Sequence, residues 1–231
     1  MKKADIIVRL RADLQTVTTE RGHAAGDPAI AAARMALRTF QSARLAKTHA
    51  DLLSSEETRP AALFFLEDLY GAADLTQRDS DIERLVPILE RMLPVAALRY
   101  IAEAIELDAL SESFDTEMAI CLGEYFTQDA YLKAYRSVGC REDRLKQIDH
   151  VHSVGQALCE LVRKPFIGST LAAMRTPAKL TKLSDLQQFL ERGYDAFKKM
   201  NKPENFVSAI VTRETQILEN IYAKKTNPFD L

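Results

Sequence analysis

The amino-acid sequence predicts an all-α fold, a single bundle of about nine to eleven helices. Gly and Pro together make up 16 of 231 residues, about 7% against a usual share of about 12%. Ala and Leu, which favour helices, greatly outnumber Val, which favours strands. Nearly every segment also repeats apolar residues at spacings of three and four, as one face of a helix requires. We therefore expect one helical domain over residues 1–231.

The first helices are placed by their capping residues. Residues 1–26 are expected to form an N-terminal helix and a turn that contains two glycines. Asp27 before Pro28 supplies a side-chain acceptor at the N-cap and a proline at the first helical position. This start predicts a second helix to about residue 53. A short apolar helix is expected over residues 61–70.

The middle of the chain is expected to hold helices with internal breaks. The Thr76–Asp79 segment resembles a capping box, and Pro87 and Pro94 predict a kink or a break in the helix that follows it. Asp115 and Thr127 are each placed to cap a further helix.

The last third of the chain predicts four helices and a tail. The helices are expected over about residues 141–163, 166–177, 184–200 and 203–224. The tail, residues 226–231, is predicted to be an extended, frayed end, although its aromatic residue could also dock on the chain or on a partner.

Charge, cysteines and apolar runs restrict the class of protein. The formal net charge is −2, which gives no global electrostatic reason to bind nucleic acid or an anionic membrane. The longest apolar run, Ala61–Leu66, is far shorter than the roughly 20 residues of a membrane helix. Cys121, Cys140 and Cys159 form no C-x-x-C pair, and no apolar stretch follows the N-terminus as a secretion signal would. We expect a cytoplasmic protein with free thiols.

Two carboxylates in the apolar helix around residue 65 need an explanation. Glu67 and Asp68 follow six consecutive apolar residues, so the helix is apolar on every side and is expected to be buried. A buried carboxylate must be neutral, paired with a cation or bound to a metal. The favoured alternative is that the two acids reach solvent or meet an arginine.

His152 borders an apolar stripe of the helix over residues 141–163. Asp149 precedes it by three positions, a spacing that resembles the Glu-x-x-His motif of di-iron bundles. This pattern carries Asp in place of Glu and occurs once, so a structural histidine is favoured. Glycine-rich phosphate loops, zinc motifs and hydrolase motifs are missing from the sequence. We therefore assign no catalytic residue and expect no metal or cofactor.

Glu214 interrupts the apolar seam of the last helix. The seam consists of Val207, Ile210, Glu214, Ile217 and Ile221. A buried charge at its centre requires a partner. The favoured partner is an arginine such as Arg136 or Arg175. The alternative is a candidate buried polar site shared by Glu67, Asp68, His152 and Glu214.

Basic residues decorate the second helix without any acid between Pro28 and Ala50. They are Arg34, Arg38, Arg44 and Lys47. A solvated positive face is favoured over nucleic-acid binding, because the only helix pair that resembles a helix-turn-helix carries acids that phosphates would repel. The acidic run Glu103–Glu117 offers an opposite face. We therefore predict a homodimer or a protein partner.

Several segments together resemble an uncharacterised family of bacterial all-helical proteins. They are F-F-L-E-D-L-Y-G, R-D-S-D-I-E-R-L-V-P-I-L, A-Y-R-S-V-G, M-R-T-P-A and F-L-E-R-G-Y. The resemblance implies a bacterial, cytosolic helical protein and transfers no functional residue. The biochemical function is thus unknown. The leading hypothesis is a binding or interaction protein without catalysis, and the alternative is a bundle enzyme or a ligand or metal binder with a buried carboxylate–histidine site.

Overall fold

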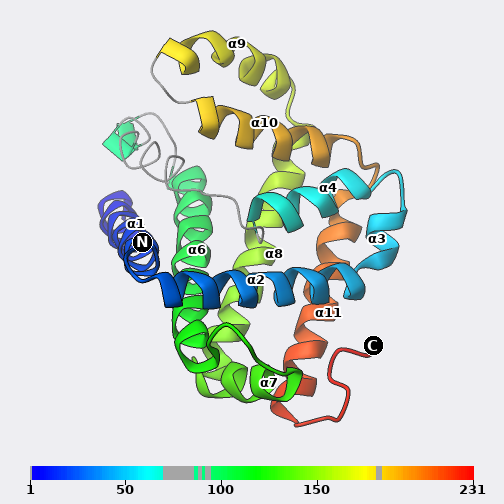
Figure 1. The fold of residues 1–231 in the computed structure, drawn as a ribbon. Helices are drawn as coiled ribbons and strands as arrows, with labels where there is room; N and C mark the ends of the chain where they lie inside the picture. The colour runs from blue at the N-terminus through cyan, green and yellow to red at the C-terminus, as the bar shows by residue number, and fades with distance from the viewer. Residues whose placement is uncertain (1, 70–85, 88–89, 92–94, 181–183) are drawn as a thin grey trace.

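The computed structural model describes residues 2–69, 86–87, 90–91, 95–180 and 184–231 (Figure 1). These residues form ten α-helices and one π-helical turn, with no strand, which confirms the all-α prediction. In chain order the elements are α1 (Lys3–Gly26), α2 (Pro28–Thr48), α3 (Ala50–Ser54), α4 (Arg59–Phe64), η1 (Phe65–Leu69), α6 (Val95–Leu122), α7 (Gln128–Ser137), α8 (Arg141–Arg163), α9 (Ile167–Leu180), α10 (Ser184–Lys198) and α11 (Pro203–Tyr222).

Helix α1 is longer than its sequence predicts. It continues through Gly22 and ends only at Gly26, so the expected turn does not form. The reason is tertiary, because Arg21 of α1 pairs with Asp108 and Glu112 of α6 and so holds the last turns against that helix. The start of α2 agrees with the prediction. Its N-cap is Asp27, whose Oδ1 accepts hydrogen bonds from the backbone amides of Ala29 and Ile30 at 2.8 and 3.3 Å.

Two other boundaries differ from the prediction, and one agrees. The second helix stops at Thr48, because His49 adopts a non-helical conformation before α3 begins. Helix α6 runs unbroken through Asp115, whose carboxylate binds Arg38 and Gln41 instead of capping a helix. Thr127 caps α7 as predicted, by accepting a hydrogen bond from the backbone amide three residues later.

The break predicted around Pro94 and the capping box at Thr76–Asp79 fall outside the described residues. The apolar segment before them is buried as expected at Ala61, Ala62 and Phe64, and then continues as the π-helical turn η1.

Three hydrophobic clusters form the described core. The first joins α4, α8, α10 and the start of α11. The second joins α2, α6, α7 and the end of α11, and the third joins α1 to the start of α6. Helices α6 and α11 each contribute to two clusters, so they connect the parts of the bundle (Figure 1). No helix among the described residues is long and apolar enough to cross a membrane.

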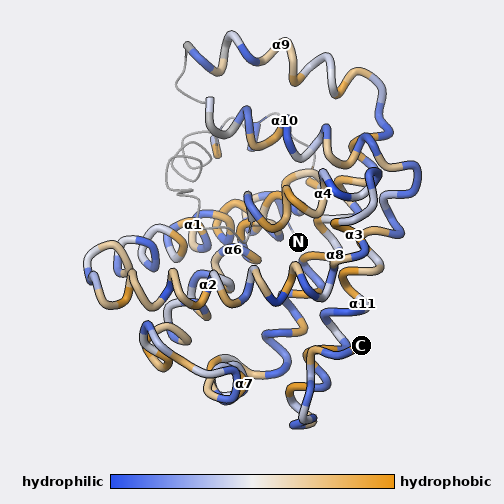
Figure 2. The backbone as a smooth tube through the Cα atoms, turned by 45° about the vertical axis from the view of Figure 1, so that its right-hand side comes forward, coloured by the Kyte–Doolittle hydropathy of each residue, from blue (hydrophilic) through white to orange (hydrophobic). Residues whose placement is uncertain are grey.

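The α9–α10 hairpin and the C-terminal tail are placed differently in the fold. Helices α9 and α10 form a hairpin in which α9 is the outermost helix (Figures 1 and 2). The tail, expected to be extended, turns back onto the bundle instead. Its Pro228 carbonyl accepts a hydrogen bond from Asn220 at 3.1 Å, and its Phe229 ring lies 6.4 Å from the Tyr131 ring. The tail docks because this pairing satisfies a buried amide and adds an aromatic ring to the second cluster.

Candidate functional site

The structure separates the residues that were grouped as a candidate buried polar site. Glu214 is largely buried in α11, with its side chain 17% exposed. Glu67 in η1 and His152 in α8 are exposed. The nearest polar contact of the His152 ring is Gln156, at 3.5 Å on the same helix. The side chain of Asp68 lies outside the described atoms. Glu214 therefore does not share its surroundings with Glu67 or His152.

Glu214 lies between an arginine and a histidine from the other end of the chain. Arg44 Nη1 donates to both carboxylate oxygens at 2.5 and 2.6 Å, and His49 Nε2 lies 2.9 Å from Oε1. Burial alone would raise the pKa of Glu214, but Arg44 and His49 outweigh it and lower that pKa below its usual value.

The expected partners of Glu214 were wrong. Arg136 donates to the backbone carbonyl of Ile221, and Arg175 pairs with Glu191 on the α9–α10 hairpin. Arg44 was assigned to a solvated face of the second helix, and the fold turns this position toward α11 instead.

A second arginine fixes the histidine from its other side. Arg213 Nη1 lies 3.5 Å from His49 Nδ1, and its guanidinium binds the Asp51 carboxylate at 2.7 and 2.8 Å. Since Arg213 has only donors, these partners favour a ring whose Nδ1 accepts and whose Nε2–H points at Glu214. The hydrogen bond from Arg213 lowers the pKa of Asp51 to about 2. The arrangement ties the break between α2 and α3 to α11 by alternating charges.

Most of the basic residues of α2, which were predicted to form a solvated face, also lie inside the fold. Glu112 of α6 is buried and receives three arginines, which are Arg21, Arg34 and Arg38. Arg34 also donates to Thr116 at 2.8 Å, and Arg38 reaches Asp115 at 3.5 Å. Burial would raise the pKa of Glu112, and the three guanidinium groups lower it instead. The basic and acidic runs that suggested docking between molecules therefore pair within one chain.

A third polar cluster joins α1, α6 and α8. Glu106 pairs with Arg9 and Lys146, and His150 Nε2 lies 3.1 Å from its other oxygen. Cations already surround this carboxylate, so it has the character of a structural ion pair. Among the described residues no group of three or more His, Cys, Asp and Glu side chains could hold a metal ion.

Helix α9 and the residue before it expose two large apolar side chains. Phe166, at its start, is 80% exposed, and Met174 is 47% exposed. Thr170 and Met174 are four positions apart and share one face of α9, whereas Phe166 is the turn residue immediately before the helix. Figure 2 shows hydrophobic residues along this outermost helix. Residues 161–184 contain five Lys or Arg and no Asp or Glu. The segment that includes α9 therefore exposes apolar side chains and carries a net positive charge.

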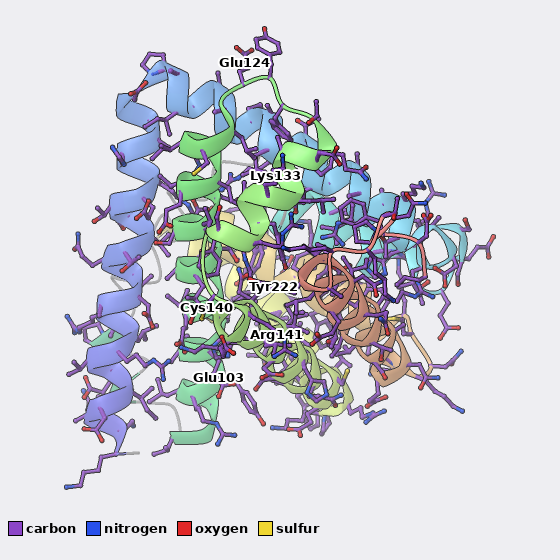
Figure 3. The ribbon with its side chains drawn as sticks, turned by 90° about the horizontal axis from the view of Figure 1, so that it is seen from below. Glu103, Glu124, Lys133, Cys140, Arg141 and Tyr222 are labelled. Atoms are coloured by element: carbon purple, nitrogen blue, oxygen red, sulfur yellow. The ribbon has the colours of Figure 1, made fainter. Side chains whose placement is uncertain are left out.

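An apolar and acidic surface lies at the other end of the bundle. The C-terminal end of α6 and the loop after it, residues 117–129, expose Ile120 and Tyr125, the latter at 87%. Three exposed acids surround them: Glu117, Glu124 and Asp129. Glu124 lies at the outer edge of the molecule in Figure 3. We call residues 117–129 the acidic corner.

A family model matches residues 20–228 of the sequence. The chain belongs to the DUF8198 family. That family is described as a domain of unknown function, which agrees with the resemblance noted from the sequence segments and extends it toward both ends of the chain. No curated protein and no solved structure matches this DUF8198 chain.

The polar residues that organise this DUF8198 chain left a signal in the sequence. Asp108, Glu112 and Asp115 recur at spacings of four and three, so they form one acidic stripe on α6. Arg34 and Arg38 form a matching basic stripe on α2. Two stripes of opposite charge on helices otherwise rich in apolar residues indicate an internal ion-pair seam. His49 left no such signal, because only the bend between α2 and α3 brings it to Glu214.

Proposed function

We propose that this chain is a protein-interaction module that binds its partner through α9. One observation carries the proposal: α9 is the outermost helix, and Met174 on it and Phe166 just before it are exposed within a segment that contains five Lys or Arg and no Asp or Glu. Exposed aromatic and methionine side chains next to arginine are typical of protein-binding surfaces.

The backbone at Phe166 supports the proposal. Its φ is 68°, a left-handed conformation that costs a bulky residue about 1–2 kcal/mol. The ring gains little from burial in return, because it is 80% exposed. A side chain that folding does not need is a reasonable contact for a partner.

The polar clusters support binding over catalysis. Glu112 and Glu214 are each surrounded by cations from neighbouring helices, so their charge is used within the fold. A cytoplasmic location belongs to the same proposal. It is supported by the three free thiols, of which Cys121 and Cys140 are exposed.

Photo-crosslinking in the native cell tests the proposed surface. A benzophenone amino acid placed at Phe166 should give a discrete adduct, whereas the same group at Val8, an exposed residue of α1, should give none. The adduct counts whether the captured protein is another species or a second copy. Equal, diffuse labelling from both positions would contradict the proposal.

A further inference from the structure

The two exposed apolar surfaces of this molecule carry opposite charges. Residues 161–184, which include α9, contain five Lys or Arg and no acid, and residues 100–132, which end in the acidic corner, contain eight Asp or Glu and no Lys or Arg. Each surface has a large exposed aromatic ring, Phe166 on the first and Tyr125 on the second. The surfaces are therefore complementary in charge and similar in apolar character.

The charges on both surfaces remain partly available. Five of the eight acids lie on the part of α6 that interacts with other helices, while Glu117, Glu124 and Asp129 have no ion-pair partner among the described residues. Lys164 and Lys179 likewise lack one within the described ranges. Arg163 and Arg175 have one acidic partner each and stay more than half exposed.

The two surfaces cannot meet within one molecule. Helix α9 lies at one end of the bundle, and α7, which follows the acidic corner, lies at the other (Figures 1 and 2). A contact between them must therefore join two copies. Such a contact is heterologous, since each copy uses a different surface, and it leaves one surface free at each end of a pair.

We propose that α9 of one copy docks on the acidic corner of a second copy, so that the chains associate head to tail. The inference rests on the proposed function and names its partner. Phe166 and Met174 pack against Ile120 and Tyr125 of the next copy, while Lys164 and Lys179 face Glu117 and Glu124. Further copies add through the free surfaces until a ring closes or a filament grows.

Mixing two variants tests this arrangement by sedimentation velocity. Phe166→Asn blocks α9 and suits the left-handed backbone, and Tyr125→Ser blocks the acidic corner. The average mass of the wild type should rise above 25.9 kDa with concentration. Each variant alone should remain at 25.9 kDa, because every contact then lacks one side. An equimolar mixture should form a pair of chains and nothing larger, because each variant supplies the surface that the other lacks.

Controls fix the meaning of each result. Val8→Ser removes an exposed apolar side chain of α1, and this variant should associate like the wild type. Glu124→Lys is a second block of the acidic corner and should also stop association. Raising the salt from low to physiological strength should weaken association by about tenfold, because surface charges contribute to it.

Three outcomes would overturn the inference. A wild type that stays monomeric at submillimolar concentration excludes self-association, and a crosslinked adduct of another protein at position 166 would then leave the proposed function standing. Loss of association in Phe166→Asn but not in Tyr125→Ser would indicate symmetric pairing of α9. A mixture that remains monomeric would exclude the head-to-tail contact.

Discussion

The seam between α2 and α6 and the outer helix α9 reverse the usual distribution of side chains. In the seam, charged groups are inside: Glu112 and Arg34 are each about 5% exposed and contact each other. At α9, two large apolar groups are outside, Met174 on the helix and Phe166 just before it. The seam balances its charges, because Arg34 and Arg38 of α2, together with Arg21 of α1, face three acids of α6. In the outer segment, Arg163 and Arg175 are paired with acids, and Lys164 and Lys179 have no ion-pair partner among the described residues.

This difference shows that a helix face rich in charged residues need not lie at the surface of the protein. Burying an ion pair costs desolvation energy, which the pair recovers only with close geometry and further hydrogen bonds. The seam meets this condition because Arg34 also binds Thr116. An exposed apolar face, in contrast, lowers the free energy of the molecule only when something covers it. The ion pairs of the seam therefore serve folding, and the exposed side chains at α9 are the ones that we propose serve contact.

Removing the acid at the centre of the seam should have the largest effect. Glu112→Ala leaves Arg21, Arg34 and Arg38 facing one another without their shared partner. We expect the free energy of unfolding to fall by about 3–5 kcal/mol, measured by chemical denaturation. Glu117→Ala on the exposed side of the same helix should change it by less than about 0.5 kcal/mol. Similar losses in both variants would contradict an internal seam.

Glu214→Ala should have the next largest effect. It leaves Arg44 largely buried without its carboxylate, and we expect a loss of about 3 kcal/mol in the free energy of unfolding. The matched control is Glu219→Ala, which removes an exposed pair with Arg141 from the same helix and should cost about 0.5 kcal/mol. An unchanged melting temperature for Glu214→Ala would show that its ion pair contributes nothing to stability.

Acid should weaken the ion pairs of Glu112 and Glu214. The folded-state pKa values of Glu112 and Glu214 lie below their usual 4.5. Their stabilising contribution is therefore complete above that pH and is lost as the pH falls through the lower folded-state values. Asp115 opposes this trend, because burial raises its pKa in the fold.

Denaturation series between neutral and acidic pH measure this dependence. The wild type should lose stability steadily below about pH 4.5. Glu112→Gln should start from a lower stability and show a flatter dependence, because one of the titrating groups is gone. A wild type whose stability rises toward acid would mean that Asp115 outweighs the two glutamates.

Phe166→Asn should have the smallest effect on stability, and this effect should be neutral or stabilising where the others are destabilising. Phe166→Asn relieves a left-handed backbone conformation and removes a ring that is mostly in water. Stability should stay the same or rise by up to about 1 kcal/mol, as thermal melts would show. A loss of 2 kcal/mol or more would mean that the ring belongs to the core, and α9 would no longer contrast with the seam.

Most of the fold could be predicted from local signals. Asp27 and Thr127 act as N-caps as expected, and the helix over residues 141–163 has the predicted bounds, because these features depend on neighbouring residues only. Gly22 and Asp115 were misjudged for the opposite reason. Contacts with Glu112 and Arg38, far away in the sequence, keep both positions helical.

The polar site could be predicted only in part. The apolar stripe on either side of Glu214 in α11 correctly indicated a buried acid that needs a cation, because the spacing of apolar residues shows which face of a helix is inside. The cation itself, Arg44, could not be chosen, because helix periodicity does not say which two helices pack together. The exposure of Glu67 agrees with the favoured expectation that this acid reaches solvent. The exposure of His152 was not expected, because His152 borders an apolar stripe in the sequence.

The distance along the chain between Arg44 and Glu214 has a consequence for synthesis. The two residues are separated by 170 positions, and the cluster beside them combines Leu37 with Ile217, Ile221 and Phe229. A ribosome releases α2 long before α11 exists, so the nascent chain carries an unfinished apolar stripe in water for most of its translation. We expect the emerging N-terminal half to be a chaperone client, and the bundle to close only when its last helix emerges.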